Sequence, residues 1–206
     1  MIPRFYPIID PALLKDGSAS GIAWFFRELI GGGATLIQLR NKTDNAKEIL
    51  SQAREMRRLA SLHRSSVRLI MNDRADLCLA AEFDGVHVGQ EDLTPEGARH
   101  VVGSRWVGVS THNPEQVRVA DHTDADYIAI GPVFQTTSKR NPDPVIGLEG
   151  IRAARELTSK PLVAIGGITL ENCRSAIEAG ADGVAIISAV LGDPRKRTEA
   201  FLRELG

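Results

Sequence analysis

The sequence predicts an α/β fold in which eight parallel strands alternate with helices and close into a (β/α)₈, or TIM, barrel. Short apolar runs rich in Ile and Val recur at intervals of about 25 residues, as strands buried on both faces do. Amphipathic, helix-like stretches separate these runs, and such alternation is typical of a parallel sheet. We expect the 206 residues to form one domain, 1–206, near the short end of the range for such barrels. An open doubly wound sheet is the alternative, but no GxGxxG motif follows the first run.

Each predicted strand is a short run bounded by polar or glycine residues. In chain order the runs are 4–10, 35–40, 67–73, 84–89, 106–110, 126–131, 161–166 and 182–188. Eight strand–helix units are enough to close the sheet on itself.

The predicted helices have an apolar face at helical spacing, clearest over 44–63, with similar stretches at 170–179 and 195–205. In 44–63 the apolar positions are Ile49, Ala53, Met56 and Ala60. We expect Asp44 to cap the start of this helix. Gly180 is a natural helix stop, because glycine tolerates the left-handed conformation that ends many helices.

Composition excludes several classes of function. The net charge is -1, so nothing in the overall charge favours nucleic acid or an acidic membrane. No segment reaches the ~18–20 apolar residues of a membrane span, and the N-terminus lacks a signal peptide's apolar core. Cys78 and Cys173 are isolated in apolar segments, which suits a cytoplasmic protein without disulfides.

Polar side chains gather where the predicted strands end. The working face of such a barrel is the one at the C-terminal strand ends. These ends carry Gln38, Arg40, Asn41, Lys42, Asn72, Asp73, Arg74, Gln90, Glu91, Asp92, Ser110, Thr111, His112, Thr136 to Arg140, Gly166, Gly167 and Ser188. The loops at the opposite ends carry much less chemistry, so we expect the site at the C-terminal face.

Two carboxylates, Asp73 and Asp92, follow neighbouring strands. Their convergence near basic side chains suits Mg²⁺, which takes one or two carboxylates together with phosphate oxygens. Each carboxylate has a structural alternative: Asp73 as the cap of a helix starting at Arg74, and Asp92 as the cap of one near Pro95. Glu91, beside Asp92, could also be the ligand or could simply be solvated, and the residues themselves leave these alternatives open.

Small-residue turns follow the last two strands, at Gly166-Gly167 and near Ser188. Backbone N–H groups at such turns often bind phosphate in these barrels. The alternative is that Gly166-Gly167 forms only a tight turn and binds no phosphate. Thr136 and Ser138 add hydroxyl donors and Lys139 adds a positive charge, whereas His87 is expected to be a hydrogen-bonded group inside the barrel.

Seven motifs resemble the thiamine-phosphate synthase family, in order and over nearly the whole chain. They are QLRNK (38–42), NDRADL (72–77), DGVHVGQEDL (84–93), GVSTH (108–112), GPVFQTTSK (131–139), AIGGI (164–168) and GVAIIS (183–188). The resemblance implies a TIM barrel that joins hydroxymethylpyrimidine diphosphate to a thiazole phosphate, with Mg²⁺, releasing pyrophosphate.

The resemblance also implies roles for residues at the matching positions. The pyrimidine diphosphate would bind Gln38, Leu39, Arg40, Asn41, Lys42, Asn72, Ser110 and Lys139, and catalysis would rest on Arg40, Lys42, Ser110 and Lys139. The thiazole phosphate would bind Thr136, Thr137, Ser138, Gly167, Ile187 and Ser188, and Mg²⁺ would bind Asp73 and Asp92. Gln135 stands where the family often has Pro, and Ser138 where it has Thr; the hydroxyl is kept.

The expected reaction is a dissociative displacement that needs positive charge on the departing diphosphate and no general base. The alternatives are a thiazole phosphate tautomerase on the same barrel, which needs no diphosphate site, and a catalytically silent thiamine-phosphate binding protein. The partners expected are small molecules, with no nucleic acid or membrane. The sequence does not determine whether the chain self-associates through apolar outer helices.

Overall fold

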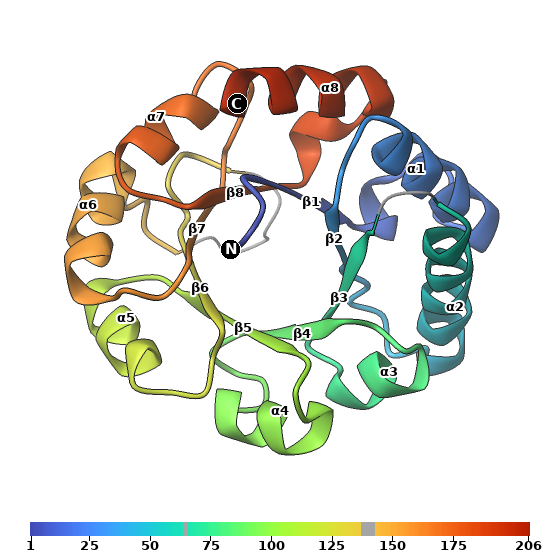
Figure 1. The fold of residues 1–206 in the computed structure, drawn as a ribbon, viewed down its shortest axis with the longest axis horizontal. Coiled ribbons are helices and arrows are strands. Elements are labelled where there is room, and N and C mark those ends of the chain that lie inside the picture. Colours follow the sequence, from blue (N-terminus) through green and yellow to red (C-terminus); the bar gives the residue numbers. More distant parts are fainter. Residues whose placement is uncertain (64–65, 137–142) are drawn as a thin grey trace.

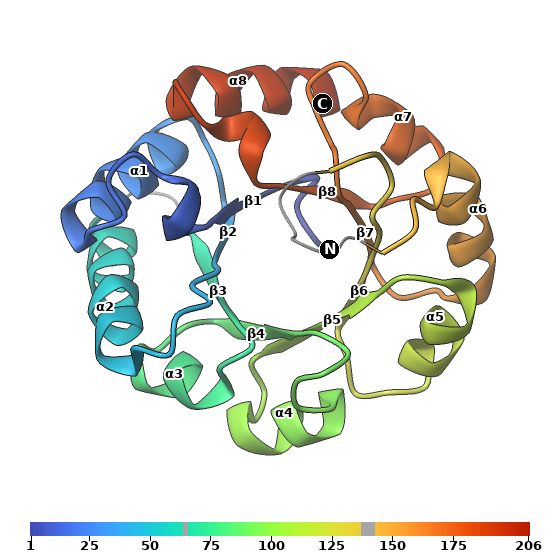
Figure 2. The same ribbon diagram turned by 180° about the vertical axis from the view of Figure 1, so that it is seen from behind.

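The computed structural model describes residues 1–63, 66–136 and 143–206. Within these residues, eight parallel strands form a closed barrel and helices surround it, as Figure 1 and the reverse view in Figure 2 show. The predicted (β/α)₈ barrel is therefore confirmed.

The strands run Phe5–Ile9 (β1), Leu36–Leu39 (β2), Arg68–Asn72 (β3), Gly85–Val88 (β4), Trp106–Thr111 (β5), Tyr127–Ile130 (β6), Leu162–Ile165 (β7) and Gly183–Ile186 (β8). The α-helices run Ala19–Gly31 (α1), Ala46–Leu62 (α2), Ala75–Ala80 (α3), Pro95–Val102 (α4), Pro114–Asp121 (α5), Gly147–Leu157 (α6), Cys173–Glu178 (α7) and Pro194–Leu205 (α8). Two short 3₁₀ turns, Pro11–Leu13 (η1) and Ser188–Val190 (η2), follow β1 and β8.

Closure of the sheet depends on β1, which pairs with both β2 and β8. Ile8 lies opposite Gln38 of β2, and Pro7 lies opposite Ile186 of β8. This pairing rules out the open doubly wound sheet, in which two edge strands would remain. All the strands are parallel, so their C-terminal ends meet on one face of the barrel.

The start of α2 differs from the sequence prediction. Asn45, not Asp44, is the capping residue, and its side-chain oxygen accepts a hydrogen bond from Glu48 N at 3.1 Å. The prediction of Asp44 was wrong by one position because Asp and Asn cap helices about equally well. The helix still presents Ile49, Ala53 and Met56 to the core.

The core has two parts, separated by the strands. The larger lies between the outer faces of the strands and the helices, and the smaller fills the barrel interior. The interior part contains Ile2, Tyr6, Ile8, Leu36, Ile70, Tyr127, Ala129, Val163 and Ala185. Alternation along each strand sends successive side chains to these two parts, so the sheet is apolar on both faces.

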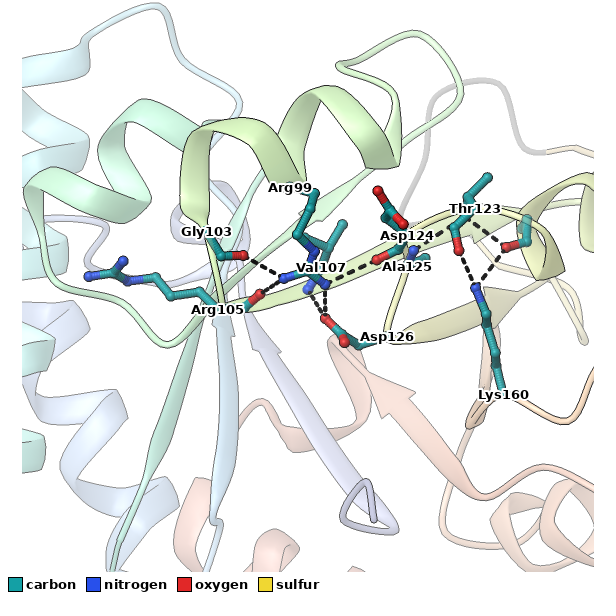
Figure 3. A network of polar contacts seen from close by, with 10 residues as sticks. Arg99, Gly103, Arg105, Val107, Thr123, Asp124, Ala125, Asp126 and Lys160 are labelled. Carbon is teal, nitrogen blue, oxygen red and sulfur yellow. Dashed lines mark hydrogen bonds and ion pairs between the residues drawn. The ribbon is translucent and has the colours of Figure 1, made fainter.

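The N-terminal strand ends are held by a repeated polar contact, drawn in Figure 3 for the loop before β6. Asp126 Oδ2 accepts hydrogen bonds from Val107 N at 2.7 Å and from Arg99 Nη2 at 2.6 Å. Arg99 also donates to the carbonyl oxygens of Gly103, Arg105 and Asp124. These bonds join α4 to the starts of β5 and β6.

Two further aspartates repeat this arrangement. Asp84 before β4 accepts from Leu69 N and Arg57, and Asp182 before β8 accepts from Leu162 N and Arg155. In each case a carboxylate ties the neighbouring strand to a helix. This face of the barrel is thus occupied by structural contacts, as expected for the end opposite the functional site. No helix among the described residues is long and apolar enough to cross a membrane.

Candidate active site

A cavity of about 600 Å³ opens at the C-terminal strand ends. The predicted site residues that line it are Gln38, Arg40, Lys42, Asn72, Asp73, Asp92, Ser110, Thr136, Gly167, Ile187 and Ser188. The structure therefore brings together polar groups from seven different strand ends. Thr137, Ser138 and Lys139, which the sequence also assigns to the site, lie outside the described residues, as does Arg140.

Two predicted residues point elsewhere. The Leu39 side chain is fully buried in the core between the strands and the helices. The Asn41 amide donates to Gln52 Oε1 at 2.9 Å and its oxygen accepts from Thr43 N, so it shapes the loop after β2. Neither side chain lines the cavity, and a substrate contact by either one stays a prediction.

Arg40 is held by a residue that the sequence analysis missed. Its guanidinium contacts Asp10 Oδ2, and the Asp10 side chain is only 7% exposed. Asp10 Oδ1 in turn accepts from Ala12 N at 3.0 Å, which fixes the carboxylate at the end of β1. Asp10 and Arg40 are 30 residues apart, and no sequence spacing signals such a pair.

The two predicted metal ligands lie together. Asp73 Oδ2 contacts Lys42 Nζ, and the neighbouring Asp92 carboxylate also interacts with Asp73. Burial raises the pKa of Asp73, and the like charge of Asp92 adds to this rise while Lys42 opposes it. Asp73 has a positive φ of 61°, and its N–H donates to His87 O at 2.7 Å, so the chain at this point is tied to β4.

The helix-cap alternatives for both aspartates do not describe the structure. The capping residue of α3 is Arg74, with no side-chain cap, and that of α4 is Thr94, whose hydroxyl accepts from Gly97 N. Asp92 Oδ2 instead accepts from Gly89 N at 2.8 Å. Both carboxylates are therefore at the cavity rather than at a helix start.

This carboxylate pair fits a hard divalent cation. A partly buried carboxylate next to a second one carries negative charge that a cation would neutralise. Among the described residues, no group of three or more His, Cys, Asp and Glu side chains forms a complete protein cage. Mg²⁺ suits such a site because it binds one or two carboxylates and completes its octahedron with water and phosphate oxygens.

Asn72 offers a further ligand-directed group. Its Nδ2 is buried and has no hydrogen-bond partner among the described residues, although the side chain lines the cavity. A buried donor without an acceptor costs roughly 1–3 kcal/mol. A ligand oxygen or ring nitrogen would satisfy it.

The cavity floor is a continuous series of side-chain hydrogen bonds. Gln38 Nε2 donates to Tyr6 Oη at 2.8 Å, and Tyr6 Oη lies 3.0 Å from Tyr127 Oη. Tyr127 Oη lies 3.0 Å from His87 Nδ1, and His87 Nε2 lies 2.8 Å from Ser110 Oγ. His87 is thus a hydrogen-bonded interior group, as predicted. Tyr6 and Tyr127 were missed, although each occupies an inward position of its strand.

The glycine turn after β7 closes the opposite side of the cavity. Gly166 and Gly167 have φ values of 94° and 65°. A Cβ on Gly167 would lie 2.4 Å from Gln135 O. Glycine is required here both by its backbone conformation and by the close approach of the loop after β6. Next to this turn, η2 places Ser188 on the same cavity wall.

His112 also lines the cavity, and its position is fixed. Nδ1 lies 2.6 Å from Gly131 O, so this nitrogen carries a proton and donates it to the carbonyl. Asp143 Oδ2 lies 3.4 Å from the same nitrogen. These contacts join the end of β5 to both sides of the loop after β6.

Most of the chain matches a known protein family. The model of one family, described as thiamine monophosphate synthase, matches residues 5–190. The chain belongs to this family. A thiamine-phosphate synthase from Koribacter versatilis is 57% identical over 206 residues, covering 99% of this chain and 96% of that protein. The thiamine-phosphate synthase from Chloroflexus aurantiacus is 42% identical over 188 residues, covering 91% of this chain and 85% of that protein.

A solved member of the family has the same fold. The thiamine phosphate pyrophosphorylase from Pyrococcus furiosus superposes with a TM-score of 0.86 at 35% identity, covering 98% of this chain and 95% of that chain. The resemblance carried by the seven sequence motifs is thereby confirmed at the level of the family.

Proposed function

We propose that this barrel is a thiamine-phosphate synthase, with residues 1–206 acting as one catalytic domain. It would join 4-amino-2-methyl-5-hydroxymethylpyrimidine diphosphate to 4-methyl-5-(2-phosphoethyl)thiazole and release pyrophosphate. The observation that carries the proposal is one cavity lined by two cations, Arg40 and Lys42, and two adjacent carboxylates, Asp73 and Asp92. Such a set suits a diphosphate leaving group, with cations for its phosphates and carboxylates that would hold a divalent cation.

The cations favour departure of the diphosphate. Negative charge builds on the leaving group as the carbon–oxygen bond breaks, and fixed positive charge in a water-poor site stabilises it. Arg40 is preorganised for this task, because Asp10 holds its guanidinium. Lys42 has an exposed side chain that contacts Asp73, so it can move to a phosphate oxygen without breaking core packing. Lys139, outside the described residues, is proposed to act with them.

Asp73 and Asp92 would hold Mg²⁺, whose chemistry when bound would be to neutralise charge on the leaving pyrophosphate. The chain itself supplies orientation. Asn72 Nδ2 is a buried donor in need of an acceptor, and Ser110 Oγ stands on the cavity floor. We assign both to the pyrimidine diphosphate, together with Gln38, Leu39 and Asn41.

The thiazole phosphate is proposed to bind across the cavity. Gly167, Ile187 and Ser188 line the wall after β7 and β8, and Thr136 lines it from the loop after β6. We propose that Thr137 and Ser138 join them. Holding the thiazole nitrogen in line with the pyrimidine methylene converts a bimolecular step into an oriented one within the complex. No general base is required, because the thiazole ring nitrogen attacks through its lone pair and carries no proton to remove.

The rival functions fit the cavity less well. A thiazole phosphate tautomerase needs the phosphate wall but has no use for Arg40, Lys42 and the carboxylate pair. A silent binding protein needs no preorganised cation such as the one that Asp10 holds. Both buried cysteines are free thiols, which supports the predicted cytoplasmic location. Self-association stays a prediction.

The test is to incubate the purified chain with both substrates, with and without Mg²⁺, and to separate the products by chromatography. We expect thiamine phosphate in the presence of Mg²⁺ and none after chelation. Conversion of a thiazole phosphate tautomer without the pyrimidine substrate would instead support the tautomerase.

A further inference from the structure

The hydrogen-bond series beneath the cavity has a fixed donor at one end. Gln38 donates to it through an amide N–H, which cannot accept. Tyr6 Oη therefore accepts at this end, and the remaining protons can be ordered in two ways. In the outward order each group donates toward Ser110, and in the inward order each donates toward Tyr6.

The inward order leaves a buried proton without an acceptor. Tyr6 Oη would accept from Gln38 and from Tyr127 at once, and its own O–H would have nowhere to go. The Tyr6 side chain is 1% exposed and packs among Ile2, Ile8, Leu36 and Ile70 in the barrel interior. An unsatisfied hydroxyl in such surroundings is costly, so the outward order is favoured.

Burial keeps the phenol protons in place. It raises the pKa of Tyr6 and Tyr127 well above the ordinary tyrosine value, so both hydroxyls stay protonated at neutral pH. In the outward order Tyr6 donates to Tyr127, and Tyr127 donates to His87 Nδ1. His87 then carries its proton on Nε2 and donates it to Ser110 Oγ.

Ser110 is the end of the series and faces the cavity. With its oxygen accepting from His87, its own O–H must find an acceptor elsewhere, and the cavity is the space beside it. In the inward order the same proton would point away from the cavity, into His87. The direction of the series therefore decides whether Ser110 presents a donor or an acceptor to a bound ligand.

Gly108 leaves the space that the Tyr127 and His87 rings occupy. This residue lies on β5 opposite Tyr127 of β6, and a Cβ at Gly108 would lie 2.4 Å from Tyr127 Oη and 2.5 Å from His87 Nδ1. Any larger side chain would displace both rings. The Tyr6 and Tyr127 rings also pack edge to face with centroids 6.1 Å apart, which holds the two hydroxyls in register.

We propose that Tyr6, Tyr127 and His87 are positioning residues that fix the Ser110 hydroxyl as a hydrogen-bond donor toward the pyrimidine substrate. The donor matches a pyrimidine ring nitrogen, which is an acceptor. The inference about the substrate rests on the proposed function. The inference about the direction of the series does not, because it concerns the protein without ligands.

The direction is tested by the tautomer of His87. The chain has five histidines, so ¹⁵N-histidine labelling with a His87→Asn variant for assignment identifies the signal. We expect Nε2 protonated and Nδ1 unprotonated in the parent. Tyr127→Phe should remove this preference and give a mixture. A parent protonated at Nδ1, or an unchanged tautomer in Tyr127→Phe, would overturn the proposal whatever the chain catalyses.

The link to the substrate is tested by a double-mutant cycle. Tyr127→Phe should lower kcat/KM for the pyrimidine diphosphate about tenfold, as the loss of one hydrogen bond would, and leave KM for the thiazole phosphate within about two-fold. In a Ser110→Ala background the same change should have an effect of less than about two-fold, because no hydroxyl remains to be oriented. Effects that simply multiply would contradict the positioning role.

Ile70→Val is the matched control, since Ile70 belongs to the same interior cluster and carries no polar atom. We expect it to leave both kinetic constants within about two-fold, as small repacking does. Thermal unfolding of all variants verifies that they fold. If Ile70→Val reproduced the tenfold loss, general packing rather than the hydrogen-bond series would explain the result.

Discussion

Lys42 Nζ contacts Asp73 Oδ2 at the cavity, so a cation proposed for the diphosphate and a carboxylate proposed for the metal form an ion pair with each other. In the proposed function each of the two charges has a partner in the bound ligands. On binding of the diphosphate with its cation, Lys42 would turn to phosphate and Asp73 to the metal. The site therefore holds a positive and a negative side chain in direct contact.

Removal of Lys42 should impair the chemical step. We expect Lys42→Ala to lower kcat/KM by about 100-fold, as loss of one preorganised charge contact to a transition state does. Lys196→Ala is the control, because Lys196 is exposed on α8 and pairs with Asp193. Steady-state kinetics with varied pyrimidine diphosphate give the comparison, and equal values for the two variants would refute the role of Lys42.

The carboxylate pair should set the metal requirement. We expect Asp92→Asn to raise the half-saturating Mg²⁺ concentration by about tenfold or more, since the charge but not the shape is lost. Asp76→Asn serves as the control: Asp76 is 62% exposed and pairs with Arg74. A magnesium titration at saturating substrates measures the effect, and an unchanged titration curve in Asp92→Asn would remove Asp92 from the metal site.

Asp10 should act through Arg40. Asp10→Asn keeps the size of the side chain but removes the charge that holds the guanidinium, and we expect kcat/KM to fall about tenfold. In an Arg40→Ala background the further loss should be less than about two-fold. Kinetics of the two single variants and the double variant test this, and a full tenfold loss without Arg40 would show that Asp10 has another role.

The opposite face should affect stability and not catalysis. Asp126→Ala removes the acceptor for Val107 N and for Arg99, and we expect the free energy of unfolding to fall by about 2 kcal/mol. Urea unfolding measures this change. The folded fraction should keep the parent kcat. A lower kcat in fully folded protein would contradict the division of the barrel into a stabilising and a functional face.

Most of the cavity could be predicted because parallel strands end on one face. Residues 30 or more positions apart, such as Gln38 and Ser110, then converge without any local signal of contact. Asp10, Tyr6 and Tyr127 were missed for a related reason. Each lies on or at the end of a strand. Its hydrogen-bond or ion-pair partner depends on how the strands are staggered around the closed barrel, and the periodicity of the sequence does not determine this stagger. The one-residue error at Asn45 reflects two equally good caps in succession.

The measurement that tests the central claim most directly is a ³¹P NMR time course of one reaction containing the chain, both substrates and Mg²⁺. We predict that thiamine phosphate and pyrophosphate appear together in a one-to-one ratio, and that neither forms when either substrate is left out. Two results would contradict the account. One is release of pyrophosphate or inorganic phosphate in the absence of the thiazole phosphate at the rate seen in the complete reaction. The other is a complete reaction that forms no thiamine phosphate.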